Sequence, residues 1–339
     1  MVKVKKEGII IESTKLDFEN QAVLNPGCIQ VDDYVHMFYR AVKEGNFSSI
    51  GYCKLKGPLT VVQRNKTPII KSEFNYEKHG CEDARITSIN NIFYLDYMAY
   101  DGHNVDAAYA TSKDLKNFTK RGKITKPVSF AELRKLLKNS PVKNEYLKYE
   151  LYDKNDFDTE NTVNIWGKDI VLFPEKINGK FALLHRVLPN IHICYFKSFK
   201  DLTKKFWMNQ YKNLHKNAVL KKKYTFESRA LGAGAPPIKT KYGWLLIFHT
   251  IEQKKDGRIY RASAALLDLK NPSKVIGRLK KPLFVPEKKW ELKGDVNNVV
   301  FPTGTALFGE KLYIYYGAAD KRIAAASLDI NELLDELRK

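Results

Sequence analysis

The chain has 339 residues, and 44% of them are hydrophobic, which allows a large core and argues against wholesale disorder. The net charge of +20 comes from scattered lysines, and no zinc-finger, helix-turn-helix or RNA-binding aromatic motif accompanies them. We therefore expect a solvated, lysine-rich surface and no nucleic-acid partner.

The four cysteines do not form a CxxC pair, and a chain of this size needs no disulfide staples. We expect them to be reduced and mostly buried, and we expect neither a metal site nor a cofactor. No segment approaches the roughly 20 apolar residues of a membrane helix. The N-terminal MVKVKKEGIIIEST also lacks the longer apolar run of a secretion signal. The sequence thus predicts a cytoplasmic protein without membrane contact.

One pattern recurs five times along the chain. It consists of a loop rich in Gly, Pro or Asn, a short apolar strand, a tight turn, and an aromatic strand with a polar end. The copies span residues 25–42, 82–102, 172–187, 232–250 and 299–320. Hairpin turns such as Asn90-Asn91 separate the two strands, and a third strand follows each copy. This repetition predicts an all-β fold, a five-bladed β-propeller, with a β-sandwich built from the same hairpins as the alternative.

Two helices are expected outside the repeats. The segment AELRKLLK, residues 131–138, places its apolar residues on one helical face. Residues from about 126 to 164 lack enough apolar side chains for a core of their own, so they are expected to form an insertion in a single domain spanning 1–339. The C-terminal segment 328–339 begins with a plausible cap and ends with basic residues, as a short helix should.

In a propeller, the innermost strand of each blade lines the central channel, so the residues that lead into these strands converge at one mouth. The lead-ins supply Asn25, Glu82, Asp83, Arg85, Glu175, Glu227, Arg229, Asp295 and Asn297, and the ends of the second strands add Arg40, Asp101, Arg186 and His249. Carboxylates beside arginines and histidines suggest glycosidic-bond cleavage, which needs an acid for the leaving oxygen and a second group for the nucleophile. The plainer alternative is that these Asp and Asn residues only cap turns.

Six segments together resemble glycoside hydrolase family 130, in the order found in that family. They are HGCEDARI, DIVLFPEKINGKFALLHR, ESRALGAGAPPI, GWLLIFH, GDVNNVVFPTG and YIYYGAAD. The resemblance implies a five-bladed propeller that acts on β-mannosides, with Asp83 as the general acid. It also implies that the mannose or the adjoining sugar is held by Asn25, Arg40, Arg85, His249 and Asp295. From their places at the mouth we add Glu82, Asp101 and Arg186 as candidates for substrate binding.

The chain departs from most members of that family at two positions. The phosphorylases that dominate the family have an arginine after the LFP element and a lysine before the GAG segment, whereas this chain has Glu175 and Ala230. A site for a dianion should present cations. The resemblance therefore implies one of the family's hydrolases, in which Glu175, assisted by Glu227, activates water.

We accordingly expect an inverting, exo-acting β-mannosidase whose substrates are β-1,2-linked manno-oligosaccharides. One alternative is a phosphate-dependent mannoside phosphorylase that grips phosphate through Arg186, Arg229 or Lys197. Another is a non-catalytic, glycan-binding propeller, because fold does not fix function. The sequence is also compatible with a homo-oligomer.

Overall fold

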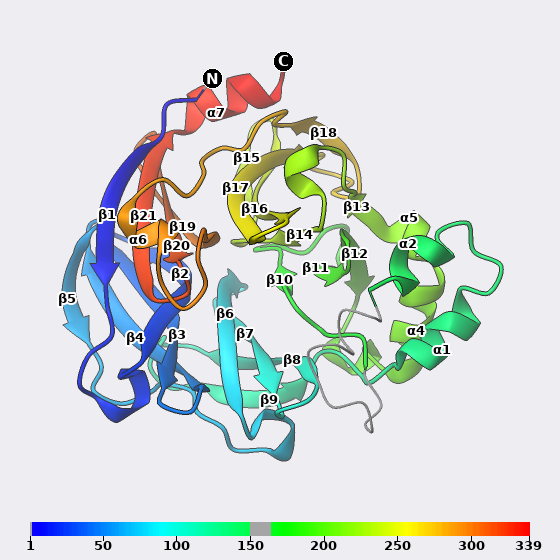
Figure 1. Cartoon of the computed structure of the whole chain (residues 1–339), viewed down its shortest axis with the longest axis horizontal. Coiled ribbons are helices and arrows are strands. Elements are labelled where there is room, and N and C mark those ends of the chain that lie inside the picture. The colour runs from blue at the N-terminus through cyan, green and yellow to red at the C-terminus, as the bar shows by residue number, and fades with distance from the viewer. Residues whose placement is uncertain (1, 150–163) are drawn as a thin grey trace.

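The computed structural model describes residues 2–149 and 164–339. These residues form mostly antiparallel strands, and Figure 1 shows their sheets arranged around a common centre. The predicted all-β class is confirmed.

The first two sheets are built from consecutive strands. The first contains β2 (Ala22–Val31), β3 (Tyr34–Lys43), β4 (Phe47–Lys56) and β5 (Thr60–Arg64). The second contains β6 (Gly80–Ile89), β7 (Ile92–Tyr100), β8 (Val105–Ser112) and β9 (Thr119–Lys123). A single parallel pair, Ser48 with Gly80, links them into one continuous sheet. We describe them as two units because all other pairings between their strands are antiparallel and lie within one unit or the other.

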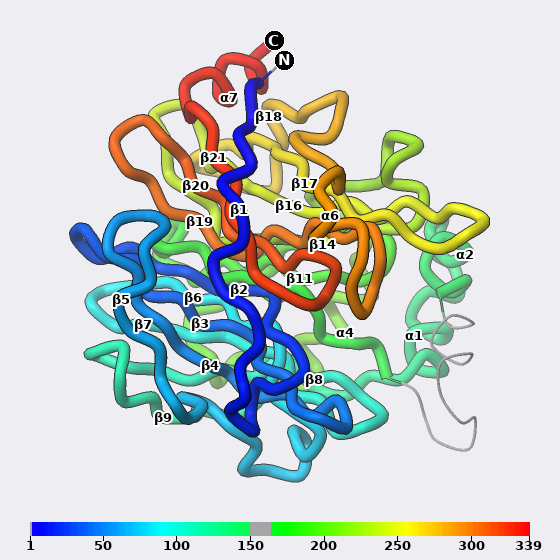
Figure 2. Tube along the Cα trace, turned by 60° about the vertical axis from the view of Figure 1, so that its left-hand side comes forward, coloured from blue at the N-terminus to red at the C-terminus, as the bar shows by residue number. Residues whose placement is uncertain are grey.

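Three further sheets follow. The third contains β10 (Val171–Leu172), β11 (Phe181–Val187), β12 (Asn190–Phe196) and β13 (Ala218–Leu220). The fourth contains β14 (Ala230–Ala233), β15 (Ile238–Thr240), β16 (Gly243–Lys254), β17 (Gly257–Leu267) and β18 (Val275–Arg278). The last contains β19 (Val300–Phe308), β20 (Lys311–Ala318) and β21 (Arg322–Asp329), and its fourth strand is β1 (Lys5–Ile11). The pairing of β1 with β21 brings the two termini together, as Figures 1 and 2 show.

The sheets contact one another in a cycle. Strand β2 contacts β6, β6 contacts β10, β14 contacts β11 and β12, β16 contacts β19, and β19 contacts β2. Hydrophobic clusters fill the spaces between successive sheets. For example, Phe38 of the first sheet packs in one cluster with Tyr97 of the second, and Leu184 of the third packs in another with Trp244 of the fourth. Each such buried side chain contributes about 1.5–3 kcal/mol relative to exposure, so the packing of sheet on sheet holds the cycle together.

A glutamate clasp recurs in four of the sheets. Each clasp begins with an aromatic residue followed by a glutamate that is fully buried: Glu19, Glu77, Glu227 and Glu291. The glutamate precedes the innermost strand and pairs with a cation on the outermost strand of the same sheet. The cations are Arg64 on β5, Lys120 on β9, Arg278 on β18 and Lys6 on β1. The clasp of the last sheet therefore uses β1, which ties the N-terminal strand to its sheet.

The helices lie at the edges of the sheets. They are α1 (Phe130–Leu136), α2 (Lys143–Leu147), α4 (Lys204–Lys212), α5 (Leu214–Asn217), α6 (Lys289–Leu292) and α7 (Ile330–Leu337). Ser129 caps α1, accepting a hydrogen bond from the backbone of Glu132. Leu133 of α1 and Trp207 of α4 belong to the same hydrophobic cluster as Leu183 of β11. Both predicted helices are confirmed, and the described part of the insertion shares its core with the sheets. Residues 150–163 of the predicted insertion lie outside the described residues.

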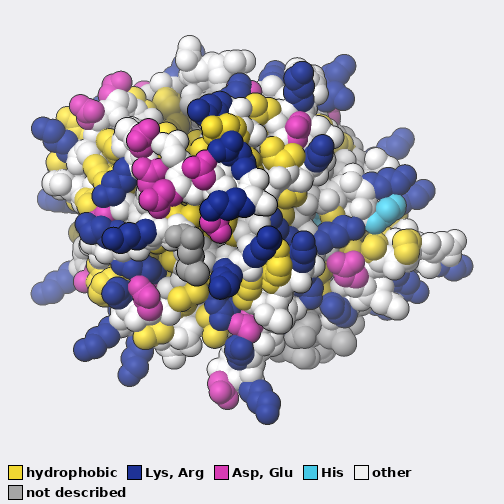
Figure 3. All heavy atoms as spheres, turned by 90° about the horizontal axis from the view of Figure 1, so that it is seen from above, with side chains coloured by type: hydrophobic (Ala, Val, Ile, Leu, Met, Phe, Trp, Pro, Cys, Tyr) yellow, Lys and Arg dark blue, Asp and Glu magenta, His cyan; other side chains and the backbone are white. Residues whose placement is uncertain are grey.

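Several sequence predictions about bulk properties can be compared with the structure. All four cysteines are buried and free of disulfides, as expected. Within residues 2–149 and 164–339, no helix has the length and apolarity to cross a membrane. On the face seen in Figure 3, lysines and arginines are spread widely among other side chains, which agrees with the expected solvated surface.

Candidate active site

Two β-bulges bring Asn25 and Asp83 together. The register shifts between Leu24 and Gly27 in β2 and between Glu82 and Arg85 in β6. Asn25 and Asp83 lie at these shifts, and each has a left-handed backbone with φ of 48°. Such a backbone is costly for a residue with a side chain, and bulges often re-aim a side chain beside an active site. Here Asn25 Nδ2 donates to Asp83 Oδ1 at 2.8 Å.

Arg40, near the end of β3, completes this group. Its Nη2 lies 2.7 Å from Glu82 Oε1 and its Nη1 lies 3.8 Å from Asp83 Oδ1, while its Nε donates to Ser48 Oγ at 2.9 Å. The Asp83 side chain is 16% exposed. Its second oxygen, Oδ2, takes part in none of these contacts. Asp83 is therefore held through one oxygen, while the other lies outside these contacts.

Arg85 crosses the centre of the molecule. Its side chain is buried, and its Nε donates to the carbonyl of Gly234, which directly follows β14 of the fourth sheet, at 2.5 Å. Glycines allow this convergence. A Cβ atom on Gly27 would stand 2.5 Å from the Ala84 carbonyl oxygen, and one on Gly234 would stand 2.5 Å from that of Pro302. The inner strands thus approach one another more closely than side chains would permit, and their polar residues share one small region.

A second polar group links the third and fourth sheets. Arg186 Nη1 lies 2.6 Å from Asp169 Oδ2, and His249 Nε2 lies 3.7 Å from the same oxygen. Burial opposes ionisation of Asp169, but Arg186 and His249 hold the pKa of this carboxyl below its usual value. Burial lowers the pKa of His249 to about 4, so the ring is neutral at pH 7. Both of its ring nitrogens are buried without a hydrogen-bond partner among the described residues, which suits a sugar hydroxyl or another ligand oxygen.

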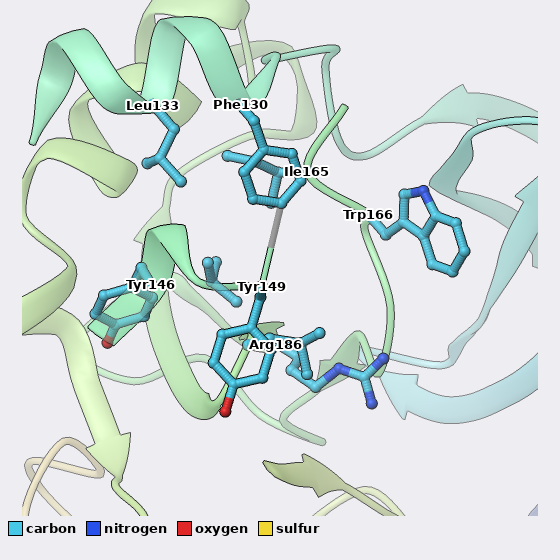
Figure 4. A pocket seen from close by; sticks show the side chains of 9 residues that line it. Phe130, Leu133, Tyr146, Tyr149, Ile165, Trp166 and Arg186 are labelled. Atoms are coloured by element: carbon cyan, nitrogen blue, oxygen red, sulfur yellow. The ribbon is translucent and has the colours of Figure 1, made fainter. Parts of the chain in front are cut away.

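Lys168 adds a second cation beside Arg186. The backbone N–H of Arg186 donates to the Lys168 carbonyl at 3.2 Å, and the Lys168 ammonium lies 4.5 Å from the centre of the Trp166 ring. Figure 4 shows Arg186 and Trp166 beside an apolar cavity that is also lined by Phe130 and Tyr149. The third sheet therefore presents two cations next to Asp169.

Asp320 connects the two groups. It follows β20 with a left-handed φ of 48°. Burial raises the pKa of its carboxyl to about 6, with Arg40 and Lys168 opposing the shift and the negative charges of Asp83 and Asp295 adding to it. Asp83 and Arg40 of the first polar group and Lys168 near the second thus all lie close enough to Asp320 to influence its pKa.

The sequence analysis did not single out Asp169, Lys168 or Asp320. Signals for two of them were present: Asp169 opens the segment DIVLFPEK, and Asp320 closes YIYYGAAD. Asp320 follows the second strand of its repeat, the place from which Arg40, Arg186 and His249 were selected.

Glu227 lies outside this site and is one of the four clasp residues. Its Oε2 accepts from the backbone N–H groups of Lys223 and Tyr224 at 2.7 and 3.0 Å. Its Oε1 lies 2.5 Å from Arg278 Nη2. The side chain is fully buried, and both oxygens are engaged by the protein. We therefore correct the expectation that Glu227 assists in activating water.

Glu175 also lies outside the site. It stands in the turn between β10 and β11, is 44% exposed, and places both oxygens 2.8 Å from Lys239 Nζ. Because β10 and β11 are antiparallel, Arg186 lies at the opposite end of this hairpin. Six residues separate Glu175 from Asp169, and at about 3.3 Å per residue they span on the order of 20 Å. The expectation that Glu175 replaces a phosphate ligand and acts as the base is therefore corrected.

The remaining candidates have peripheral positions. Asp101 caps the turn after β7, where its Oδ1 accepts from the backbone N–H groups of His103 and Asn104. Asp295 pairs with Lys321 at 3.1 Å and is 40% exposed, so it lies at the rim near Asp320. Of the predicted residues, the structure brings together Asn25, Arg40, Glu82, Asp83, Arg85, Arg186 and His249.

Comparison with known proteins identifies the family. The family model of glycoside hydrolase family 130, described as beta-1,4-mannooligosaccharide phosphorylase, matches residues 7–339. A 1,2-beta-oligomannan phosphorylase from Thermoanaerobacter sp. (strain X514) is 33% identical, over 98% of this chain and 99% of its own length. A beta-1,2-mannobiose phosphorylase from the same strain is 32% identical over 97% of each. Among solved structures, the beta-1,2-mannobiose phosphorylase from Listeria innocua superposes with a TM-score of 0.73 over 99% of both chains, at 22% identity, and so supports the fold alone. The chain belongs to glycoside hydrolase family 130.

Proposed function

We propose that this protein is a phosphorylase that cleaves β-1,2-linked manno-oligosaccharides with inorganic phosphate and releases mannose 1-phosphate. The placement of Arg186 near His249, with Lys168 as a second cation near Asp169, carries this proposal, because cations suit a phosphate dianion. The hydrolase expected from the sequence depended on Glu175 and Glu227, whose carboxylates pair with Lys239 and Arg278. The phosphorylase alternative, by contrast, used Arg186, which lies in the site.

In the proposed reaction, Asp83 acts as the general acid. Its carboxyl group gives a proton to the glycosidic oxygen as the bond from that oxygen to the anomeric carbon breaks. A phosphate oxygen attacks the anomeric carbon from the opposite face, so the β-mannoside gives α-mannose 1-phosphate. Because phosphate is itself the nucleophile, no second carboxylate is required to activate water. Asp83 then recovers a proton from solvent.

The other residues hold the reactants in the proposed site. Asn25 and Arg40 fix Asp83 through its Oδ1 and leave Oδ2 toward the substrate. Asp169 orients the Arg186 guanidinium, which presents its remaining N–H groups to phosphate. The unpaired ring nitrogens of His249 are suited to a sugar hydroxyl or a phosphate oxygen. No metal or cofactor is required by this scheme.

We also propose that the sheets are the five blades of one propeller and one domain. The cycle of contacts between successive sheets and the recurrence of the glutamate clasp support this arrangement. The predicted cytoplasmic location and homo-oligomer stay predictions.

The reverse reaction tests the proposed activity. The purified protein is incubated with α-mannose 1-phosphate and mannose, and inorganic phosphate and disaccharide are measured. We expect equal amounts of phosphate and β-1,2-mannobiose, and neither product from the Asp83→Asn variant. A protein that forms no disaccharide here but hydrolyses β-1,2-mannobiose would contradict the proposal.

A further inference from the structure

An aromatic pair lies at the same end of the strands as Asp83. Phe47 opens β4 and His79 directly precedes β6, which contains Asp83. Their rings are stacked, with centroids 5.1 Å apart and planes inclined by 14°. Phe47 is 39% exposed, so one side of its ring is open to solvent.

Two contacts join this pair to the active site. Ser48, the neighbour of Phe47, accepts the hydrogen bond from Arg40 Nε at 2.9 Å. On the other side, the His79 ring contacts the Tyr100 ring at 5.8 Å. Burial, followed by the charge of Glu82, raises the pKa of Tyr100, so this ring lies within the field of the active-site carboxylates. Tyr100, His79 and Phe47 therefore form an aromatic row from the Arg40–Glu82 pair to the surface.

The outer ring of this row is the most accessible to a ligand. His79 is covered on one side by Phe47. On another side it is closed in by Gly102, where a Cβ atom would stand 2.5 Å from His79 Cδ2. Phe47 and His79 both line an open cavity of about 290 Å³, at the small end of ligand sites, and Phe47, at 39%, has the more exposed ring. The polar side chains of the same cavity are the donors Lys43, Ser48, Ser49, Lys71, Ser72 and Lys78 and the acceptor Asp17, which lies 3.7 Å from Lys43 Nζ, so sugar hydroxyls could both donate and accept there.

We propose that the aromatic row of Tyr100, His79 and Phe47 binds the sugar units of a β-mannooligosaccharide on the reducing-end side of the scissile bond, with Phe47 as the outermost platform. This inference rests on the proposed function, because it assumes that the scissile bond lies at Asp83. The apolar ring of Phe47 matches the C–H face of a sugar, and the serine hydroxyls and lysine ammonium groups beside it match the sugar hydroxyls. The row makes Phe47 a residue that sets the preference for longer substrates.

The test compares substrates of different length. We would measure kcat/KM for β-1,2-mannotetraose and for β-1,2-mannobiose in the wild type, in Phe47→Ala and in Phe47→Trp. Stacking on an aromatic ring is worth about 0.5–1.5 kcal/mol, so Phe47→Ala should lower the tetraose-to-biose ratio about 3- to 10-fold, through KM. Phe47→Trp should restore the ratio. An unchanged ratio in Phe47→Ala would overturn the inference.

Phe74→Ala is the matched control. Phe74 is 46% exposed and stacks on Tyr76 with centroids 5.3 Å apart, so it resembles Phe47 in exposure and stacking. It is not among the residues that line the cavity. We expect the tetraose-to-biose ratio to stay at the wild-type value in Phe74→Ala, and an equal drop in both variants would overturn the inference.

A binding measurement separates this inference from the proposed function. Calorimetric titration of β-1,2-mannotetraose into Asp83→Asn protein, with and without Phe47→Ala, needs no turnover. A Kd weakened about 3- to 10-fold by Phe47→Ala would support the platform even if phosphorolysis were absent. The same Kd in both proteins would refute the platform whatever the reaction.

Discussion

Two sets of carboxylates in this protein differ both in exposure and in what surrounds them: the clasp glutamates are fully buried, whereas the Asp83 side chain is 16% exposed. The clasp glutamates are closed: Glu77, for example, accepts from two backbone N–H groups and from Tyr97, and it pairs with Lys120. The carboxylates of the site are open. Asp83 keeps one oxygen outside its protein contacts, and burial raises the pKa of Asp320 to about 6. In this fold, carboxylates whose two oxygens are both engaged by the protein are structural, whereas a carboxylate oxygen outside protein contacts stays available to a ligand.

Replacing the acid of the open set should have the largest effect. Asp83→Asn keeps the shape of the side chain and its contact with Asn25, but it removes the proton needed by the leaving oxygen. General acid catalysis typically contributes about 10²- to 10⁴-fold, so we expect kcat to fall by about 10³-fold. Initial rates of mannose 1-phosphate release, with the melting temperature as a control for folding, measure this. A variant that retains a tenth of the activity would remove Asp83 from the acid role.

Replacing a closed carboxylate should affect stability instead. Glu227→Gln leaves the largely buried Arg278 without its counter-ion, and breaking a buried ion pair in this way costs about 3–5 kcal/mol. Urea denaturation should show this loss, while kcat of the folded protein at low temperature stays within a few-fold of wild type. A variant of normal stability that has lost activity by orders of magnitude would place Glu227 in catalysis after all.

Asp320 should make stability depend on pH in a direction opposite to that of most carboxylates. Its pKa is about 6 in the folded protein against a usual value of 3.8. The contribution of Asp320 to folding is therefore complete below pH 4 and is lost as the pH rises through 6. The stability of Asp320→Asn relative to wild type should be greater at pH 7 than at pH 4 by about 2 kcal/mol, since one pKa unit is worth about 1.4 kcal/mol and part of the penalty is already present at pH 4. The free energies of unfolding at the two pH values test this, and an equal difference at both would contradict the raised pKa.

Glu175→Gln should have the smallest effect. Its ion pair with Lys239 is about half exposed on both sides, and such surface pairs contribute at most about 1 kcal/mol. We expect kcat and KM to stay within two-fold of wild type in a standard phosphorolysis assay. A loss of two orders of magnitude would restore Glu175 to the reaction and reopen the hydrolase interpretation.

The parts of this structure that were predictable from the sequence are those with local signals. The turn Asn90-Asn91 joins β6 to β7, with φ of 52° and 60° for its two residues, as the dipeptide suggested. The repeated lead-ins also predicted that Asn25 and Asp83 lie near each other, because the same loop–strand–turn–strand pattern recurs around the fold.

The wrong predictions concern strand lengths and contacts between residues that are far apart in the sequence. Glu175 was taken as a lead-in, but the third inner strand is only Val171–Leu172, so Asp169 stands at the site and Glu175 at the far end. Glu227 is paired with Arg278, which lies 51 residues further along the chain. No local pattern reveals that ion pair. The aromatic–glutamate pairs at four lead-ins were a signal of a structural role, and their repetition was visible in the sequence.

Product analysis with and without phosphate tests the central claim most directly. The protein is incubated with β-1,2-mannobiose in both conditions, and the sugars are identified. We predict mannose 1-phosphate and mannose in equal amounts with phosphate, and no cleavage without it. Free mannose at the same rate in both conditions, with no sugar phosphate, would contradict the assignment of Arg186 and Lys168 to phosphate and show that the protein is a hydrolase.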